Sequence, residues 1–116
     1  MALINITEAE DITILEQELE GTSVTLVLSK KQFTAIVWFL CNPNSSRLRV
    51  TDAVTDTAVV YYSSEHDEFS ISQSDQEIYG SRAIENCGFS ETLWMHRLKN
   101  VQDSNGPQNA PNVNAS

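Results

Sequence analysis

The stretch TSVTLVLSKKQFTAIVWFLCN, residues 22–42, places a strand directly before a helix. In its first seven residues every second position is aliphatic, at Val24, Leu26 and Leu28, with Ser23 and Thr25 between them, the pattern of a strand with one buried face. Ser29 and Gln32 then have the spacing of a capping box, which predicts a helix start at residue 30. Pro43 disfavours a helical conformation in the residue before it, so we expect a strand over 22–28 and a helix over 30–41.

The helix predicted over 30–41 is apolar nearly all round, because its polar residues fall in the first turn. One stripe, at positions i, i+3, i+4 and i+7, is predicted to face a sheet; it consists of Phe33, Ile36, Val37 and Leu40. A second apolar side needs another cover, either the chain's own last helix or another molecule. The candidate interface residues are Ala35, Trp38, Phe39 and Trp94.

Outward from this unit, short alternating segments predict further strands over 2–6, 47–54, 57–63 and 68–73. Ser90 is a candidate N-cap for a last helix over about 91–101. Together these elements predict an α+β fold, an antiparallel sheet of about four to six strands with two helices packed on one face. We expect residues 1–101 to form a single domain and the Asn- and Pro-rich residues 102–116 to form a polar tail.

Residues 7–21 fit two structures. A helix would begin with a capping box at Thr7 and Glu10, but two glutamates near its end would oppose the helix dipole. A hairpin turning at Glu20 and Gly21 would set Leu15 opposite Leu26, and the β-branched residues 12–14 favour it. Either structure exposes an acidic surface; its candidate partner-binding residues are Glu10, Asp11, Glu16, Glu18 and Glu20.

The chain is acidic because bases are scarce: its 116 residues include 16 acids and 7 bases, for a net charge of −9. This charge opposes direct binding to nucleic acid or to an anionic membrane, since phosphate contacts require cations. No apolar run approaches the roughly 20 residues that a bilayer span needs. Without a basic, apolar leader pattern, and with Cys41 and Cys87 read as buried reduced thiols, we expect a cytoplasmic protein, of a cell or of an infected host.

No motif for catalysis, for a cofactor or for a metal is present: the sequence has no P-loop, no GxGxxG and no zinc-ligand spacing. The densest polar run, SSEHDE at 63–68, is typical of a solvated turn, because successive side chains on a strand end point apart. We therefore predict a non-enzymatic protein without cofactor, with no catalytic and no metal-binding residues. It would act through protein–protein contact, as a homo-oligomer or a small subunit of an assembly, which would suit a viral or phage accessory or structural protein.

Two other functions are compatible with the sequence. On a strand, Glu16, Glu18 and Glu20 would be spaced about 6.6–6.8 Å apart, close to the spacing of phosphates. This predicts an inhibitor that mimics nucleic acid toward a DNA- or RNA-binding protein, as an anti-defence protein would; a solvated edge that discourages aggregation is the simpler interpretation. The other alternative, a small ligand-binding domain or enzyme, requires a pocket with converging polar groups.

Overall fold

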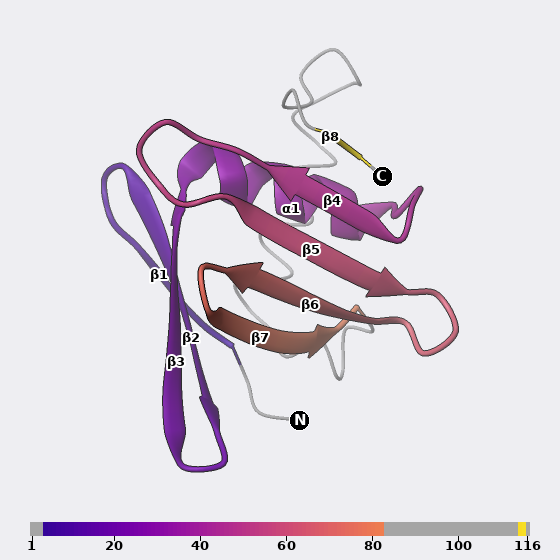
Figure 1. The fold of residues 1–116 in the computed structure, drawn as a ribbon, viewed down its shortest axis with the longest axis horizontal. Helices are drawn as coiled ribbons and strands as arrows, with labels where there is room; N and C mark the ends of the chain where they lie inside the picture. The colour runs from indigo at the N-terminus through magenta and orange to yellow at the C-terminus, as the bar shows by residue number, and fades with distance from the viewer. Residues whose placement is uncertain (1–3, 83–113, 116) are drawn as a thin grey trace.

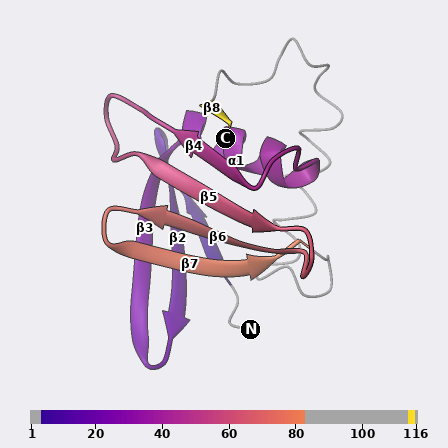
Figure 2. The same cartoon turned by 45° about the vertical axis from the view of Figure 1, so that its right-hand side comes forward.

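Two antiparallel sheets and a helix make up the part of the chain that the computed structural model describes, residues 4–82 and 114–115. The first sheet has the order β1-β2-β3 and consists of β1 (Asn5–Glu8), β2 (Ile12–Leu19) and β3 (Thr22–Ser29). The second has the order β7-β6-β5-β4-β8 and consists of β4 (Arg47–Val50), β5 (Ala58–Ser63), β6 (Glu68–Gln73), β7 (Gln76–Ser81) and β8 (Asn114–Ala115). The long strands of the first sheet run steeply across those of the second (Figures 1 and 2).

Strands β2 and β3 form the hairpin that the alternation of their residues favours. Leu15 lies opposite Leu26 in the predicted register. The turn residues Glu20 and Gly21 have φ angles of 51° and 80°, and two consecutive positive φ values are the mark of a tight turn that matches the strand twist. The hairpin interpretation of residues 7–21 is confirmed, and the helical one is wrong.

Helix α1 (Lys30–Cys41) begins directly after β3, as predicted. The Ser29 hydroxyl accepts a hydrogen bond from the Gln32 backbone N–H, and the Gln32 side chain accepts one from the Ser29 N–H, both at 3.0 Å. Most of the helix surface is buried, because α1 packs against β2 and β3 of one sheet and β4 of the other. Among the residues that the structure describes, no helix has the length and apolar character to cross a membrane.

The hydrophobic core is a single cluster to which both sheets and the helix contribute. Its fully buried large apolar side chains are Ile4, Leu15, Leu26, Leu28, Ile36, Leu40, Leu48, Ile71 and Ile78. Burial of each such side chain contributes about 1.5–3 kcal/mol. Because α1 fills the space between the sheets, the residues predicted to face a sheet pack against this shared core.

Two buried glutamines join the sheets where β3 and β7 approach each other. The Gln17 side chain on β2 accepts a hydrogen bond from the Tyr79 N–H at 2.9 Å and donates one to the Tyr79 carbonyl at 2.7 Å. In the opposite direction, the Gln73 side chain on β6 accepts from the Val27 N–H at 2.8 Å and donates to the Val27 carbonyl. β7 and β3 are edge strands of their sheets. Each side-chain amide thus forms the two hydrogen bonds that a neighbouring strand would form with Tyr79 or Val27, whose backbone groups would otherwise be unpaired.

A third glutamine ties the start of α1 to the loop between β4 and β5. The Gln32 amide nitrogen donates to the Val50 carbonyl at 3.2 Å and to the Asp56 carbonyl at 2.8 Å. Its oxygen also accepts from the Thr55 hydroxyl at 2.6 Å. Gln32 is fully buried, and its side-chain donors and acceptor are all used, so it can serve as both a capping residue and an interior cross-link.

The predicted fold class is wrong. The structure is mostly β, with two antiparallel sheets instead of one, and its described part contains one helix instead of two helices on one face of a sheet. The prediction failed for two reasons. The stretch after residue 73, for which the sequence predicts no element, supplies β7. In addition, α1 separates β3 from β4, so the strands on its two sides pair independently.

The remaining predicted elements differ mainly at their boundaries. The strands expected over 57–63 and 68–73 are confirmed as β5 and β6, whereas the strand expected over 47–54 ends at Val50. It ends there because the chain turns at Asp52, whose carboxylate accepts a hydrogen bond from the Val54 N–H at 2.9 Å. The helix predicted over 91–101 lies outside the described residues, and from the predicted tail only β8, paired with β4, is described.

Candidate functional site

The solvent-facing side of the second sheet, which we call the outer face, holds the two exposed tyrosines of the described residues, Tyr61 and Tyr79. Paired residues of neighbouring strands lie on the same face of a sheet. One row across β4, β5, β6 and β7 is Arg47, Tyr61, Ser70 and Tyr79, and the next row is Arg49, Val59, Ser72 and Glu77. The opposite side of the same strands is buried in the core.

A hollow of about 440 Å³ lies on the outer face, lined by Tyr61 and Tyr79 with Ser70 between them. The two tyrosines are 47% and 44% exposed. Because they are two strands apart, their backbones are separated by about 10 Å, twice the usual strand spacing. The small Ser70 leaves room between the rings, and we call this space the tyrosine slot.

Opposite charges lie at the two ends of these rows. On β4, the guanidinium of Arg47 lies 5.8 Å from the ring centroid of Tyr61, within the range of a cation–π contact. On β7, the Glu77 carboxylate accepts hydrogen bonds from the Ser72 hydroxyl at 3.0 Å and from the Tyr79 hydroxyl at 2.5 Å. The bond to Glu77 raises the pKa of Tyr79, with a smaller contribution from desolvation. These two bonds hold the Glu77 carboxylate in one orientation.

A second hollow of about 370 Å³ lies at the junction of the two sheets and is lined by Val27 and Val54. Val54 is 86% exposed at the tip of the β4–β5 loop. The exposed large apolar residues of the described chain are therefore these two valines and the two tyrosines, and each pair lines a hollow. Exposed apolar residues that are scattered singly are ordinary, whereas apolar residues gathered in a concave surface make that surface a candidate site.

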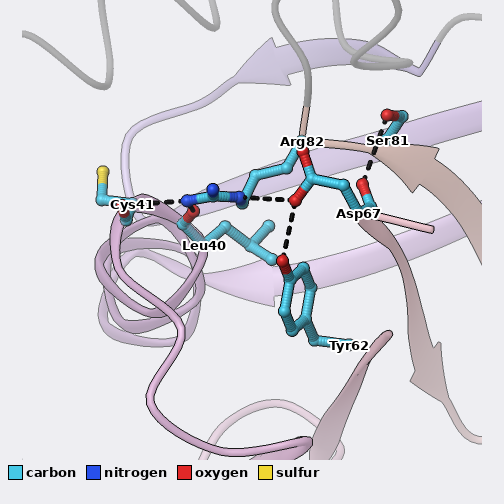
Figure 3. Close-up of polar contacts among 6 residues, drawn as sticks. All are labelled: Leu40, Cys41, Tyr62, Asp67, Ser81 and Arg82. Carbon is cyan, nitrogen blue, oxygen red and sulfur yellow. Dashed lines mark hydrogen bonds and ion pairs between the residues drawn. The ribbon is translucent and has the colours of Figure 1, made fainter. Parts of the chain in front are cut away.

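A cluster of polar side chains surrounds Arg82, at the C-terminal end of α1 (Figure 3). Arg82 donates to the carboxylate of Asp67 at 2.9 Å and to the carbonyls of Leu40 and Cys41 at 3.3 and 3.2 Å. The Tyr62 hydroxyl donates to the same carboxylate at 2.7 Å. The last turn of α1 contains no basic residue, so Arg82 supplies the positive charge that a helix C-terminus favours. The cluster thus attaches the helix to the second sheet.

The ionisation of this cluster fits a structural role. Partial burial alone would raise the pKa of Asp67, but the hydrogen bonds from Arg82 and Tyr62 and the charge of Arg82 hold it below its usual value. Burial raises the pKa of the Cys41 thiol to about 11, against a smaller lowering by Arg82. A thiol of this pKa is protonated at neutral pH and is therefore a poor nucleophile.

The predicted interface residues occupy different environments. Ala35 and Phe39 are 2% and 7% exposed and belong to the core cluster, whereas Trp38 is half-buried against it. Trp94 lies outside the described residues. The interface role of this set stays a prediction, and among its described members only Trp38 retains appreciable accessible surface.

The predicted acidic surface is exposed but does not form a single row. Glu16 and Glu18 alternate with buried Leu15 and Gln17 and lie on the solvent side of β2. Glu20 is in the turn, at a positive φ, and Glu10 and Asp11 lie before β2. The phosphate-like spacing therefore applies to Glu16 and Glu18 alone, because Glu20 has left the strand.

Among residues 4–82 and 114–115, no group of three or more His, Cys, Asp or Glu side chains is placed to hold a metal ion. In the run SSEHDE, Glu65 and His66 are exposed, whereas Asp67 belongs to the Arg82 cluster and has a φ of 54°. The left-handed conformation separates Asp67 from its neighbours, so the run is a turn whose side chains have different partners.

Sequence reasoning missed the residues that carry the most structural information. Tyr61 lies in a predicted strand, where an aromatic side chain on the solvent side is a usable signal, whereas Tyr79 lies in a stretch for which the sequence predicts no element. A similar signal was available for Gln17 and Gln73, because each is a polar residue at the core phase of its strand, where Leu15 and Ile71 set the pattern. Comparisons with protein-family models, curated proteins and solved structures found no match.

Proposed function

We propose that this chain is a non-enzymatic binding protein that acts through contact with another protein chain, and that the outer face is its docking surface. The observation that carries the proposal is the pair of exposed tyrosines facing each other across Ser70 in an open hollow. Tyrosine is enriched in the energetically dominant centres of protein interfaces, because it buries a large area at a small entropy cost.

The charges around the hollow support a protein partner over a nucleic acid. Glu68 lines the hollow and Glu77 lies beside Tyr79, so the acidic end would repel phosphates. Arg47 and Arg49 at the other end offer partners for carboxylates. A surface with both signs of charge around an aromatic centre is typical of a protein interface. A cytoplasmic setting is part of the proposal, supported by the free thiol of Cys41.

The proposal can be tested by placing a photo-crosslinking phenylalanine analogue at Tyr61. Thr34, exposed on α1, provides the matched control position. We expect a covalent adduct of defined mass from position 61 and none from position 34 when the purified chain, alone or in extract from its source, is irradiated. Equal adducts at both positions, or none at position 61, would show that the outer face is not a docking surface.

A second candidate function, occupation of the nucleic-acid groove of a basic protein, is favoured by the exposed position of Glu16 and Glu18 on β2. Reversal of both charges to lysine should then abolish binding to such a partner, and added oligonucleotide should compete with the unmodified chain. Reversal at Glu65, an exposed acid in the β5–β6 turn, provides the control. Binding that survives the double reversal would exclude this function.

A further inference from the structure

The outer face is complementary to itself. From β4 to β7, one row of the outer face runs Arg47, Tyr61, Ser70, Tyr79. When the same row of a second copy is laid over it in reverse order, Arg47 meets the ring of Tyr79, and the large Tyr61 meets the small Ser70. The neighbouring row runs from Arg49 to Glu77, and its reversal sets a base against an acid. A two-fold symmetric interface requires this self-complementarity, because each row of one copy contacts the same row of the other copy in reverse order.

We propose that the partner of the outer face is a second copy of this chain. The two copies are related by a two-fold axis that lies between the stacked sheets, runs parallel to the strands and passes over the gap between β5 and β6. This rotation stacks the sheets face to face with their strands nearly aligned, a common geometry for packed sheets. It places β4 over β7 of the second copy and β5 over β6. The inference rests on the proposed function and adds the identity of the partner and the register of the contact.

The central row supplies the shape of the contact. Tyr61 of each copy lies over Ser70 of the other and enters the tyrosine slot there. The four rings, Tyr79 and Tyr61 of both copies, then alternate at about the strand spacing of 4.8 Å. That spacing falls within the 4.5–7 Å range of favourable aromatic pairs. Because this row crosses β5, β6 and β7 near their middle, a modest angle between the sheets displaces it little.

The charges supply the specificity. Strands β4 to β7 place two bases, Arg47 and Arg49, and two acids, Glu68 and Glu77, on the outer face, so the charges of these four strands balance there although the chain has a net charge of −9. Stacking places Arg49 against Glu77 of the second copy, twice per dimer, and Arg47 against the ring of Tyr79. Glu77 is already oriented by Ser72 and Tyr79, which lowers the entropy cost of pairing.

The size of the face sets the expected strength. Four strands at about 4.8 Å by six residues at about 3.4 Å give a flat area on the order of 400 Å² per copy. A standard interface buries about 800 Å² per partner, so this dimer lies at the weak end. We expect a dissociation constant roughly in the micromolar range or above, with dimer forming as the protein is concentrated.

Sedimentation equilibrium of the full chain over a concentration series tests the pairing through charge exchange. Arg49→Glu and Glu77→Arg should each weaken dimerisation at least about tenfold, because each sets like charges against each other. An equimolar mixture of the two variants should recover a heterodimer, since every contact again joins an acid to a base. Glu18→Arg makes the same charge change as Glu77→Arg, but on the other sheet, and should leave the dissociation constant within about twofold.

Ser70→Tyr provides a second variant that does not depend on charge. It fills the slot from a half-buried position on the outer face and should abolish the dimer while the thermal unfolding curve stays that of a folded protein. A wild-type chain that remains monomeric at high concentration, or a variant mixture that does not associate, would overturn the inference. If the chain is monomeric yet position 61 crosslinks to a different protein, the proposed function stands and self-pairing fails; if position 61 also yields no adduct, both fail.

Discussion

Replacing Gln73 with methionine tests whether a single side-chain amide closes the junction between the two sheets. Gln73 is 7% exposed and makes three hydrogen bonds, with the N–H and carbonyl of Val27 and with the carbonyl of Asp56. Methionine has nearly the same length and shape but can make none of these bonds. The Asp56 carbonyl keeps its bond from Gln32, so the substitution leaves two backbone groups of Val27 without a partner.

The cost follows from the environment of Val27. A backbone group that loses its hydrogen bond and is shielded from water destabilises the fold by about 1–3 kcal/mol. A group that water can reach destabilises it by only about 0.5–1.5 kcal/mol. Val27 is 39% exposed beside the second hollow, which favours the lower range with partial rehydration. For the two groups together we expect a loss of about 1–3 kcal/mol in the free energy of unfolding, or a fall in Tm of roughly 4–20 °C for a domain of this size.

Urea unfolding and calorimetry measure this loss, and Gln76→Met provides the matched control. Gln76 lies opposite Gln73 in the β6–β7 register but is exposed, so its replacement should change stability by less than about 0.5 kcal/mol. Hydrogen exchange adds a local readout. The Val27 amide should lose protection in the Gln73 variant, whereas the Leu28 amide, which points toward β2 by the alternation of the ladder, should keep it.

The reasoning would be refuted by a Gln73→Met variant no less stable than Gln76→Met, or by an unchanged exchange rate at Val27. Either result would mean that water or a neighbouring group satisfies the β3 edge without help from β6.

Three further predictions address other parts of the fold. Gln17→Met should cost about 1–3 kcal/mol in urea unfolding, comparable to the Gln73 change, because it leaves the N–H and the carbonyl of Tyr79 without their side-chain partner and Tyr79, like Val27, is partly exposed. Asp67→Asn should lower stability at pH 7 by removing the charge partner of Arg82. Since the pKa of Asp67 is held below 3.8 when folded, the wild-type advantage is present above that pH and is lost as the pH falls through the lowered pKa, so urea midpoints of the two proteins should converge in acid. Glu20→Asn should raise the free energy of unfolding by up to about 1 kcal/mol and the melting temperature with it, because asparagine tolerates the positive φ of this turn better than glutamate. An unchanged or lower melting temperature would contradict this.

The elements that depend on local pattern were predictable. The capping box at Ser29 and Gln32 defined the start of α1, and the alternation of residues 22–28 defined β3. The register of Leu15 and Leu26 followed from a turn at Glu20 and Gly21. These features involve residues close in sequence, so the information that specifies them is contained in the stretch itself.

The candidate site was not predictable to the same degree. Strand assignment placed Tyr61 correctly but could not show that Ser70 and Tyr79 would lie beside it, because the strand of Tyr79 fell in a stretch without a clear period. The apolar side chains of α1 at Ala35 and Phe39 suggested an interface, yet a helix between two sheets has two faces to bury within its own chain. Sequence periodicity reports that a face is apolar and does not report what covers it.

By itself, the sequence determined the strand over 22–28, the helix α1 and the acidic character of the chain, and it favoured a hairpin over a helix for residues 7–21. Only the tertiary structure decided that the strands form two sheets, that Gln17 and Gln73 each complete the edge of the opposite sheet, and that Arg82 caps a helix some 40 residues earlier. The physical reason is the range of the interactions. Propensity, capping and alternation act over a few residues, whereas a buried amide or guanidinium finds its partner only when the whole core has brought distant backbone groups within hydrogen-bonding distance.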